Sequence, residues 1–110
     1  MIFDKDGNTS IITQEKVSII ELVKKLDVIY SRFQNDNIIV NLTSLKSLST
    51  QDVVEFLKIS AQHRKAKHSF VIVTDKIKLE DIPNELVIVP TIQEAYDIIE
   101  MEEIERDLGF

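Results

Sequence analysis

Three apolar runs constrain the fold of this 110-residue chain more than any other feature. They are IIVNL at 38–42, SFVIVT at 69–74 and ELVIV at 85–89. Apolar and polar residues do not alternate within them, and continuous β-branched runs are typical of strands that are buried on both faces. Helical patterns separate or follow these runs. The order therefore predicts parallel strands joined by right-handed crossovers, with helices packed against the sheet.

The segments around these runs predict further elements. Residues 2–14 have the pattern of a β-hairpin that turns at Asp6-Gly7-Asn8. The first strand of this hairpin is short and terminal, so we expect it at an edge of the sheet. Apolar residues at helical spacing predict one helix over 17–33 and a second from about 50 to 65.

The last third of the chain predicts a connection, a strand and a final helix. Residues 75–84 are polar and leave room for one helical turn before the strand at 85–89. Thr91 and Glu94 have the spacing of a capping box at the start of the last helix, and Gly109 lies just past its end. The expected fold is α/β, with a mixed, mostly parallel sheet of about five strands, in a single domain spanning 1–110.

Charge and composition exclude several classes of protein. The formal net charge is −6, which argues against a nucleic-acid partner. The acidity is concentrated from Glu94 onward, where seven acidic residues accompany one basic residue, Arg106. The chain has no run of about 20 apolar residues, so no membrane span is predicted. It has no cysteine and no signal-peptide pattern at its start, so we expect a cytoplasmic protein.

The order of elements and one motif resemble the STAS domain, a family named for sulfate transporters and anti-sigma-factor antagonists. In that family a strand ends in Asp-Leu-Ser, and an apolar position and Asp-Ser-Ser-Gly then lead into a helix. Here the strand ends at Asn41-Leu42-Thr43, Leu45 is the apolar position, and the four-residue motif falls on Ser-Thr-Gln-Asp at 49–52. The strands SFVIVT and ELVIVP and the helix start TIQEA also match, so the resemblance covers nearly the whole chain.

The resemblance implies a non-enzymatic regulatory domain that binds another protein, such as an anti-sigma factor or a kinase-like regulator. The family's phosphoacceptor is the second serine of its motif, and Gln51 occupies that position here. The usual serine phosphoswitch is therefore not expected. Two alternatives to this regulatory role stay open. The chain is then either a STAS module that binds a nucleotide- or lipid-like small molecule or an accessory subunit of an enzyme.

Four residues of the motif are candidate site residues. Ser49 and Thr50 are candidate phosphorylation sites, because a phosphate at a helix start is held by free N–H groups or breaks a partner's contact by its charge. Capping of the helix explains the same two hydroxyls more simply, and we favour it. Gln51 and Asp52 are candidate partner contacts that need no phosphate.

The C-terminal segment DIIEMEEIERDLGF mixes apolar residues with acids. The predicted helix is longer than the sheet requires, so Leu108 and Phe110 are expected to reach past it. They either pack back on the chain or dock on a partner or on a second copy, which makes a homodimer possible.

The remaining polar residues do not form a recognisable active site. His63 and His68 are five residues apart, which does not match a metal-binding pair on a helix, and no metal or cofactor is expected. We interpret His63 as a surface residue or a cation near a helix C-terminus. Two interpretations apply to the cations Lys46, Arg64, Lys65 and Lys67, which form either a basic patch for phosphate or a solvated helix end. The net charge of the chain favours the solvated helix end. With two glycines and no G-x-S-x-G sequence, neither a phosphate loop nor a nucleophile elbow is present.

Overall fold

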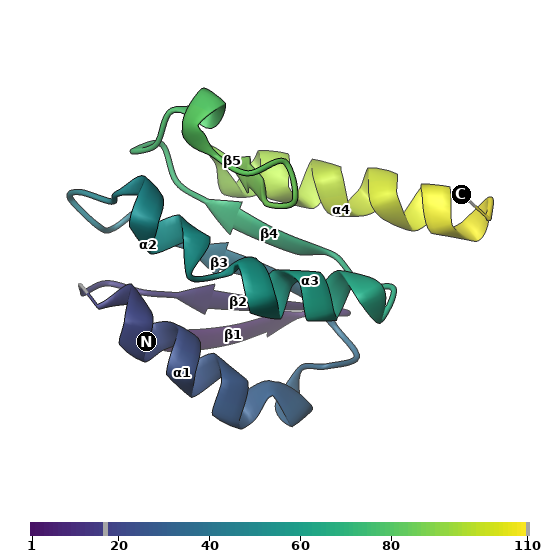
Figure 1. The fold of residues 1–110 in the computed structure, drawn as a ribbon. Coiled ribbons are helices and arrows are strands. Elements are labelled where there is room, and N and C mark those ends of the chain that lie inside the picture. The colour runs from purple at the N-terminus through teal and green to yellow at the C-terminus, as the bar shows by residue number, and fades with distance from the viewer. Residues whose placement is uncertain (17, 110) are drawn as a thin grey trace.

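A five-stranded sheet runs through the computed structural model, which describes residues 1–16 and 18–109 (Figure 1). Its strands lie in chain order: β1 (Ile2–Asp6), β2 (Thr9–Thr13), β3 (Asn37–Asn41), β4 (Phe70–Val73) and β5 (Val87–Val89). β1 pairs with β2 in antiparallel orientation, and every later pair of neighbours is parallel. The predicted α/β class with a mixed, mostly parallel sheet is therefore confirmed.

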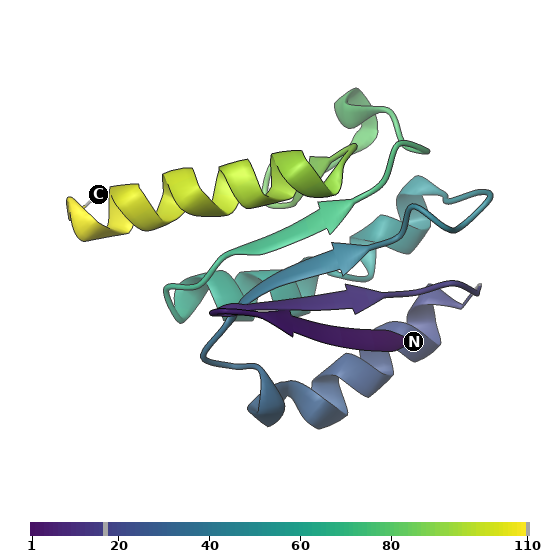
Figure 2. The ribbon, with the colours of Figure 1, turned by 180° about the vertical axis from the view of Figure 1, so that it is seen from behind.

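Helices cover both faces of the sheet. They are α1 (Ile19–Ile29), the 3₁₀ turn η1 (Tyr30–Arg32), α2 (Thr50–Val54), α3 (Leu57–Lys65), the 3₁₀ turn η2 (Leu79–Asp81) and α4 (Ile92–Asp107). Figures 1 and 2 show α1, α2 and α3 on one face and α4 on the other. Each parallel crossover advances by one strand with the same hand, which places the crossover helices on one side. α4 follows the last strand and folds back over the opposite face, where it contacts β3, β4 and β5.

Strand β3 is buried on both of its faces. Ile38 and Val40 belong to the larger apolar cluster under α1, α2 and α3, whereas Ile39 belongs to the smaller cluster under α4. The absence of alternation in this run of sequence thus reflects two separate cores. Among the described residues, no helix combines the length and apolar character needed to cross a bilayer.

The N-terminal hairpin forms as the sequence predicts. Asp6 pairs with Thr9, so Gly7 and Asn8 make a two-residue turn, and Gly7 has a φ of 59° that suits glycine. β1 lies at the edge of the sheet and is mostly exposed. Its charged residues Asp4 and Lys5 disfavour pairing with a further strand.

Two predicted helices have different bounds in the structure. The helix predicted over 17–33 begins at Ile19 after the N-cap Ser18 and tightens into η1 beyond Ile29. The helix predicted from 50 to 65 is divided, because the N–H groups of Glu55 and Phe56 bond to carbonyls three residues back. The buried residues Val53, Phe56 and Ile59 are three apart. A tightened turn keeps such a series on one side, whereas a straight α-helix would rotate it away from the core.

Helix α3 ends in a Schellman motif with lysine where glycine is usual. The His68 N–H bonds to the His63 carbonyl at 3.3 Å, and the Lys67 N–H bonds to the Arg64 carbonyl at 3.0 Å. Lys67 has a φ of 70°, in the left-handed region. Its Cβ is a steric cost in that conformation, and glycine avoids it.

We expect Lys67→Gly to raise the free energy of unfolding by about 1 kcal/mol, because it removes the Cβ penalty of the left-handed conformation. Urea denaturation measures the change. The matched control is Lys65→Gly, at a helical position two residues earlier, which should lower stability by up to about 1 kcal/mol. Equal effects of the two substitutions would contradict the assignment of strain to Lys67.

Candidate functional site

The motif residues follow the carboxyl end of β3, at the edge of the sheet where open α/β folds commonly place ligand sites. Asn41 fixes the first turn, because its Oδ1 accepts bonds from the Thr43 N–H at 3.1 Å and the Thr43 hydroxyl at 2.8 Å. Leu42 and Leu45 are buried in the larger apolar cluster and hold the loop against it. The loop thus leads into α2 along a defined path.

A reciprocal capping box opens α2. The Ser49 Oγ accepts the Asp52 N–H at 3.1 Å, and the Asp52 Oδ2 accepts the Ser49 N–H at 3.0 Å. Ser49 has the extended backbone of an N-cap, with φ −98° and ψ 161°. The favoured interpretation of Ser49 as a helix cap therefore agrees with the observed bonds, and Asp52 completes the cap as its partner.

The other two motif residues are not part of this cap. Thr50 is half-buried and Gln51 is exposed. The Gln51 amide makes no side-chain hydrogen bond to a described residue, so its donors and acceptor face solvent. α2 has only five residues, and its dipole offers little stabilisation to an added phosphate.

The motif residues and Leu108 lie at opposite ends of the parallel strands. α4 runs back from the carboxyl end of β5, so Leu108 lies beyond the amino edge, where the end of α4 reaches past the strands (Figure 2). Leu108 is 67% exposed, as expected for a residue that extends beyond the sheet. Phe110 is outside the described residues. The motif and Leu108 therefore belong to two separate surfaces.

His63 is fully buried, so its interpretation as a surface residue or helix-end cation is wrong. Its Nε2 lies 2.6 Å from the Asp36 carbonyl oxygen, which can only accept, so Nε2 carries the proton. Its Nδ1 then accepts the Tyr30 hydroxyl at 2.7 Å. Burial lowers the pKa of His63 from 6.5 to about 4, which keeps the ring neutral near pH 7. Burial also raises the pKa of Tyr30.

A second polar network lies at the amino ends of β3 and β4. Asn37 Oδ1 accepts the Ser69 N–H at 2.9 Å and Arg106 Nη2 at 3.3 Å. The Ser69 hydroxyl donates to Glu102 at 2.6 Å. These bonds join the starts of β3 and β4 to α4. One signal in the sequence can identify the network, because polar residues directly precede the buried runs at 36–37 and 68–69.

The basic patch, which the sequence disfavours, does not form. Arg64 is half-buried and bonds to Glu102 at 3.1 Å and to the Phe70 carbonyl at 3.2 Å. Lys46 follows β3 at the carboxyl edge, whereas Lys65 and Lys67 precede β4 at the amino edge. Within the described ranges, no three His, Cys, Asp or Glu side chains gather as a metal site.

The fold and these contacts define an α/β domain with a mixed five-stranded sheet and a capped, exposed turn after its third strand. No protein-family model matches the sequence, and no curated protein matches it either. The likeness to STAS domains therefore rests on the motif residues and on the order of elements.

We expect Ser49→Ala to lower the free energy of unfolding by about 1 kcal/mol, because the Asp52 N–H loses its acceptor. Urea denaturation measures the loss. Ser47→Ala is the matched control, since Ser47 is exposed in the same loop and should change stability by less than about 0.5 kcal/mol. An equal loss in both variants would contradict a specific capping role.

Protonation of His63 should destabilise the fold in acid. Its folded pKa of about 4 lies below its ordinary value of 6.5, so its contribution is complete above pH 6.5 and is lost as the pH falls toward 4. Between about pH 7 and about pH 4.5 we expect this group to remove about 2–3 kcal/mol of stability.

Urea denaturation across this pH range, in the wild type and in His63→Gln, isolates the contribution of His63. The wild type should lose more stability than the variant by that amount. His68→Gln is the control and should keep most of the loss seen in the wild type, because burial is the main cause of the lowered pKa of His63 and the charge on His68 is a lesser one. A His63→Gln variant with an unchanged pH dependence would show that His63 is not the titrating group.

Proposed function

We propose that this chain is a cytoplasmic, non-enzymatic STAS-like domain that regulates another protein by binding it at the start of α2. The partner class is an anti-sigma factor or a kinase-like regulator, and contact does not require a serine phosphoswitch. The observation that carries the proposal is the exposed Gln51 amide, which bonds to no side chain among the described residues, on a helix start fixed by the Ser49–Asp52 cap.

The rigidity of this turn supports a role in recognition. Val53 of α2 and Phe56, two residues past its end, are fully buried and hold this helix on the core, while the capping box fixes its first turn. A side chain that is presented from an ordered backbone loses less conformational freedom on binding. Gln51 offers both a donor and an acceptor from such a position, which suits a specific contact with a protein surface.

The geometry of Ser49 disfavours a phosphate at that residue. Its Oγ already accepts the Asp52 N–H at 3.1 Å, and the Asp52 carboxylate is bonded to the same residue's N–H. A phosphate on this oxygen would carry nearly two negative charges beside that carboxylate. Like-charge repulsion would then break the cap, so constitutive contact fits this helix start better than a switch.

Affinity purification from the native host, with mass spectrometry and phosphosite mapping, tests the proposal. We expect Gln51→Arg to reduce capture of the partner about fivefold or more, because a bulky cation replaces a contacting amide. Gln62→Arg is the matched control, since Gln62 is an exposed glutamine on α3, and it should capture the partner as the wild type does.

Two results would contradict the proposal. Equal capture by the Gln51 and Gln62 variants would remove α2 from the interface. Phosphate mapped to Ser49 or Thr50, together with loss of the partner in Thr50→Glu but not in Thr50→Val, would show a phosphoswitch instead.

A further inference from the structure

The outer face of α4 carries an apolar stripe. Met101, Ile104 and Leu108 are 50%, 53% and 67% exposed. They are three and seven residues apart, so they lie on one side of the helix. The residues of α4 that are buried against the sheet, Ala95 and Ile99, face the other way. The stripe therefore has no packing partner among the described residues.

The rim of this stripe is acidic. Glu100, Glu105 and Asp107 are exposed beside it. The one basic residue of α4, Arg106, is instead directed to the sheet, where it donates to the Ser69 hydroxyl at 3.2 Å and to Asn37 at 3.3 Å. The charges beside the stripe are thus negative.

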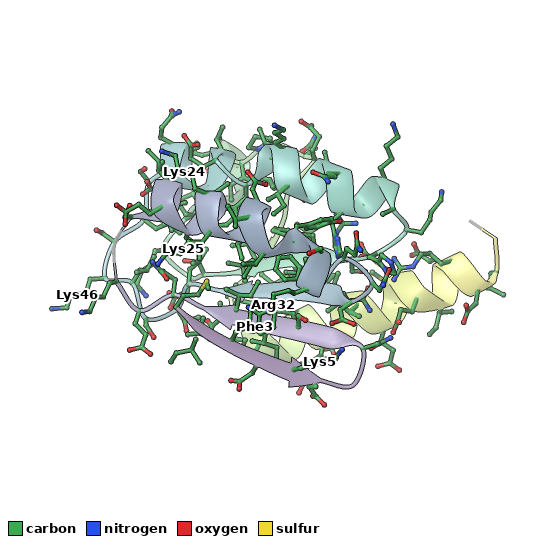
Figure 3. All side chains as sticks on the ribbon, turned by 90° about the horizontal axis from the view of Figure 1, so that it is seen from below. Phe3, Lys5, Lys24, Lys25, Arg32 and Lys46 are labelled. Carbon is green, nitrogen blue, oxygen red and sulfur yellow. The ribbon has the colours of Figure 1, made fainter. Side chains whose placement is uncertain are left out.

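A groove of about 310 Å³ lies between α1 and the start of β1. Met1, Val28 and Ile29 supply its apolar surface, and Val28 is 82% exposed. The charged residues that line it are all cations: Lys24, Lys25 and Arg32. Figure 3 shows these three along α1 and η1, above Phe3 of β1. Arg32 lies over the Phe3 ring at 5.7 Å.

The cations of the groove are available to an external partner. Within the described part of the chain, Lys24, Lys25 and Arg32 take part in no salt bridge; the pairs formed are Lys5–Asp36, Arg64–Glu102 and Lys76–Asp75. An apolar groove with a cationic rim is complementary in both respects to an apolar stripe with an acidic rim. Each extends over about 10 Å, because both Lys25 to Arg32 and Met101 to Leu108 span two helical turns.

We propose that the α4 stripe of one copy docks in the α1–β1 groove of a second copy. The two surfaces cannot meet within one chain, because α1 and α4 lie on opposite faces of the sheet (Figures 1 and 2). The contact is therefore heterologous, and each bound copy leaves a free groove at one end and a free stripe at the other.

The size and charge of the surfaces set the strength of this contact. Two helical turns bury less than the roughly 1,200 Å² of a stable interface, so the association is weak. The ion pairs at its rim are exposed, so added salt weakens it further. The inference does not use α2, and its test is independent of the proposed partner contact at Gln51.

Sedimentation velocity on the full chain tests the inference. We expect the weight-average sedimentation coefficient to rise with protein concentration at low salt and to fall when salt is added. Val28→Asp blocks the groove and Leu108→Asp blocks the stripe, and each variant alone should remain a monomer. An equimolar mixture of the two should form a dimer and nothing larger, because only one intact groove and one intact stripe can pair.

Leu79→Asp is the matched control. Leu79 lies on η2, belongs to neither the stripe nor the groove, and is 65% exposed, close to the value for Leu108. This variant should associate as the wild type does. Thermal unfolding of each variant, followed by circular dichroism, confirms that the exposed substitutions leave the fold intact.

Charge reversal supplies a second arm. Lys24→Glu with Lys25→Glu should abolish self-association of that variant, and mixing it with a copy carrying Glu100→Lys with Glu105→Lys should restore association. A monomeric wild type at all concentrations would overturn the inference, as would failure of the blocked variants to pair. If the chain never self-associates but binds a fatty acid such as laurate at Val28, the inference is overturned and the groove is a site for a lipid-like ligand.

Discussion

Burial of β3 on both faces is the constraint on which the rest of the molecule depends. Ile38 and Val40 need cover on one side and Ile39 needs cover on the other. Each buried aliphatic side chain contributes about 2 kcal/mol relative to exposure. Crossover helices can cover only one face when successive strands advance in one direction. α4 has to fold back over the second face, where Val71 and Val73 would otherwise be exposed beside Ile39.

The position of α4 is further fixed by polar contacts at the amino edge of the sheet. Asn37 serves two elements at once, because its Oδ1 accepts the Ser69 N–H of the neighbouring strand start and the Arg106 guanidinium of α4. Its Nδ2 donates to Glu103 at 3.2 Å. Buried polar groups are costly unless they are bonded, so these contacts select one placement of the helix along the sheet. Apolar packing alone would tolerate others.

The sequence predicts those features whose causes are local. The strands follow from continuous apolar runs, the hairpin from Asp6-Gly7-Asn8, and the cap of α4 from Thr91, whose Oγ1 accepts the Glu94 N–H at 3.1 Å. The cap of α2 by Ser49 and Asp52 can be predicted in the same way, because a capping box joins residues three apart. The break between α2 and α3 was not predicted, since a three-residue spacing of buried side chains is close to the helical period.

Features that depend on distant residues were missed. The partners of His63 are 27 and 33 residues away in the sequence, so its burial has no local signal. The groove likewise combines Met1 with side chains of α1, and only the fold brings them together. The position of Leu108 beyond the sheet was predicted from helix length, but the outward direction of the stripe requires the observed packing of Ala95 and Ile99.

The apolar side of α4 changes from one half of the helix to the other. Ala95 and Ile99 face the sheet, whereas Met101 and Ile104, two and five residues beyond Ile99, face outward. A helix turns by about 100° per residue. The number of residues between these two sets therefore determines the angle between the face that packs on the sheet and the face that is exposed. Insertion or deletion of a single residue there would keep the composition and charge of the helix, yet it would aim its distal half in a new direction. Packing of the first half of α4 against the sheet thus determines the direction in which the apolar stripe of its second half faces.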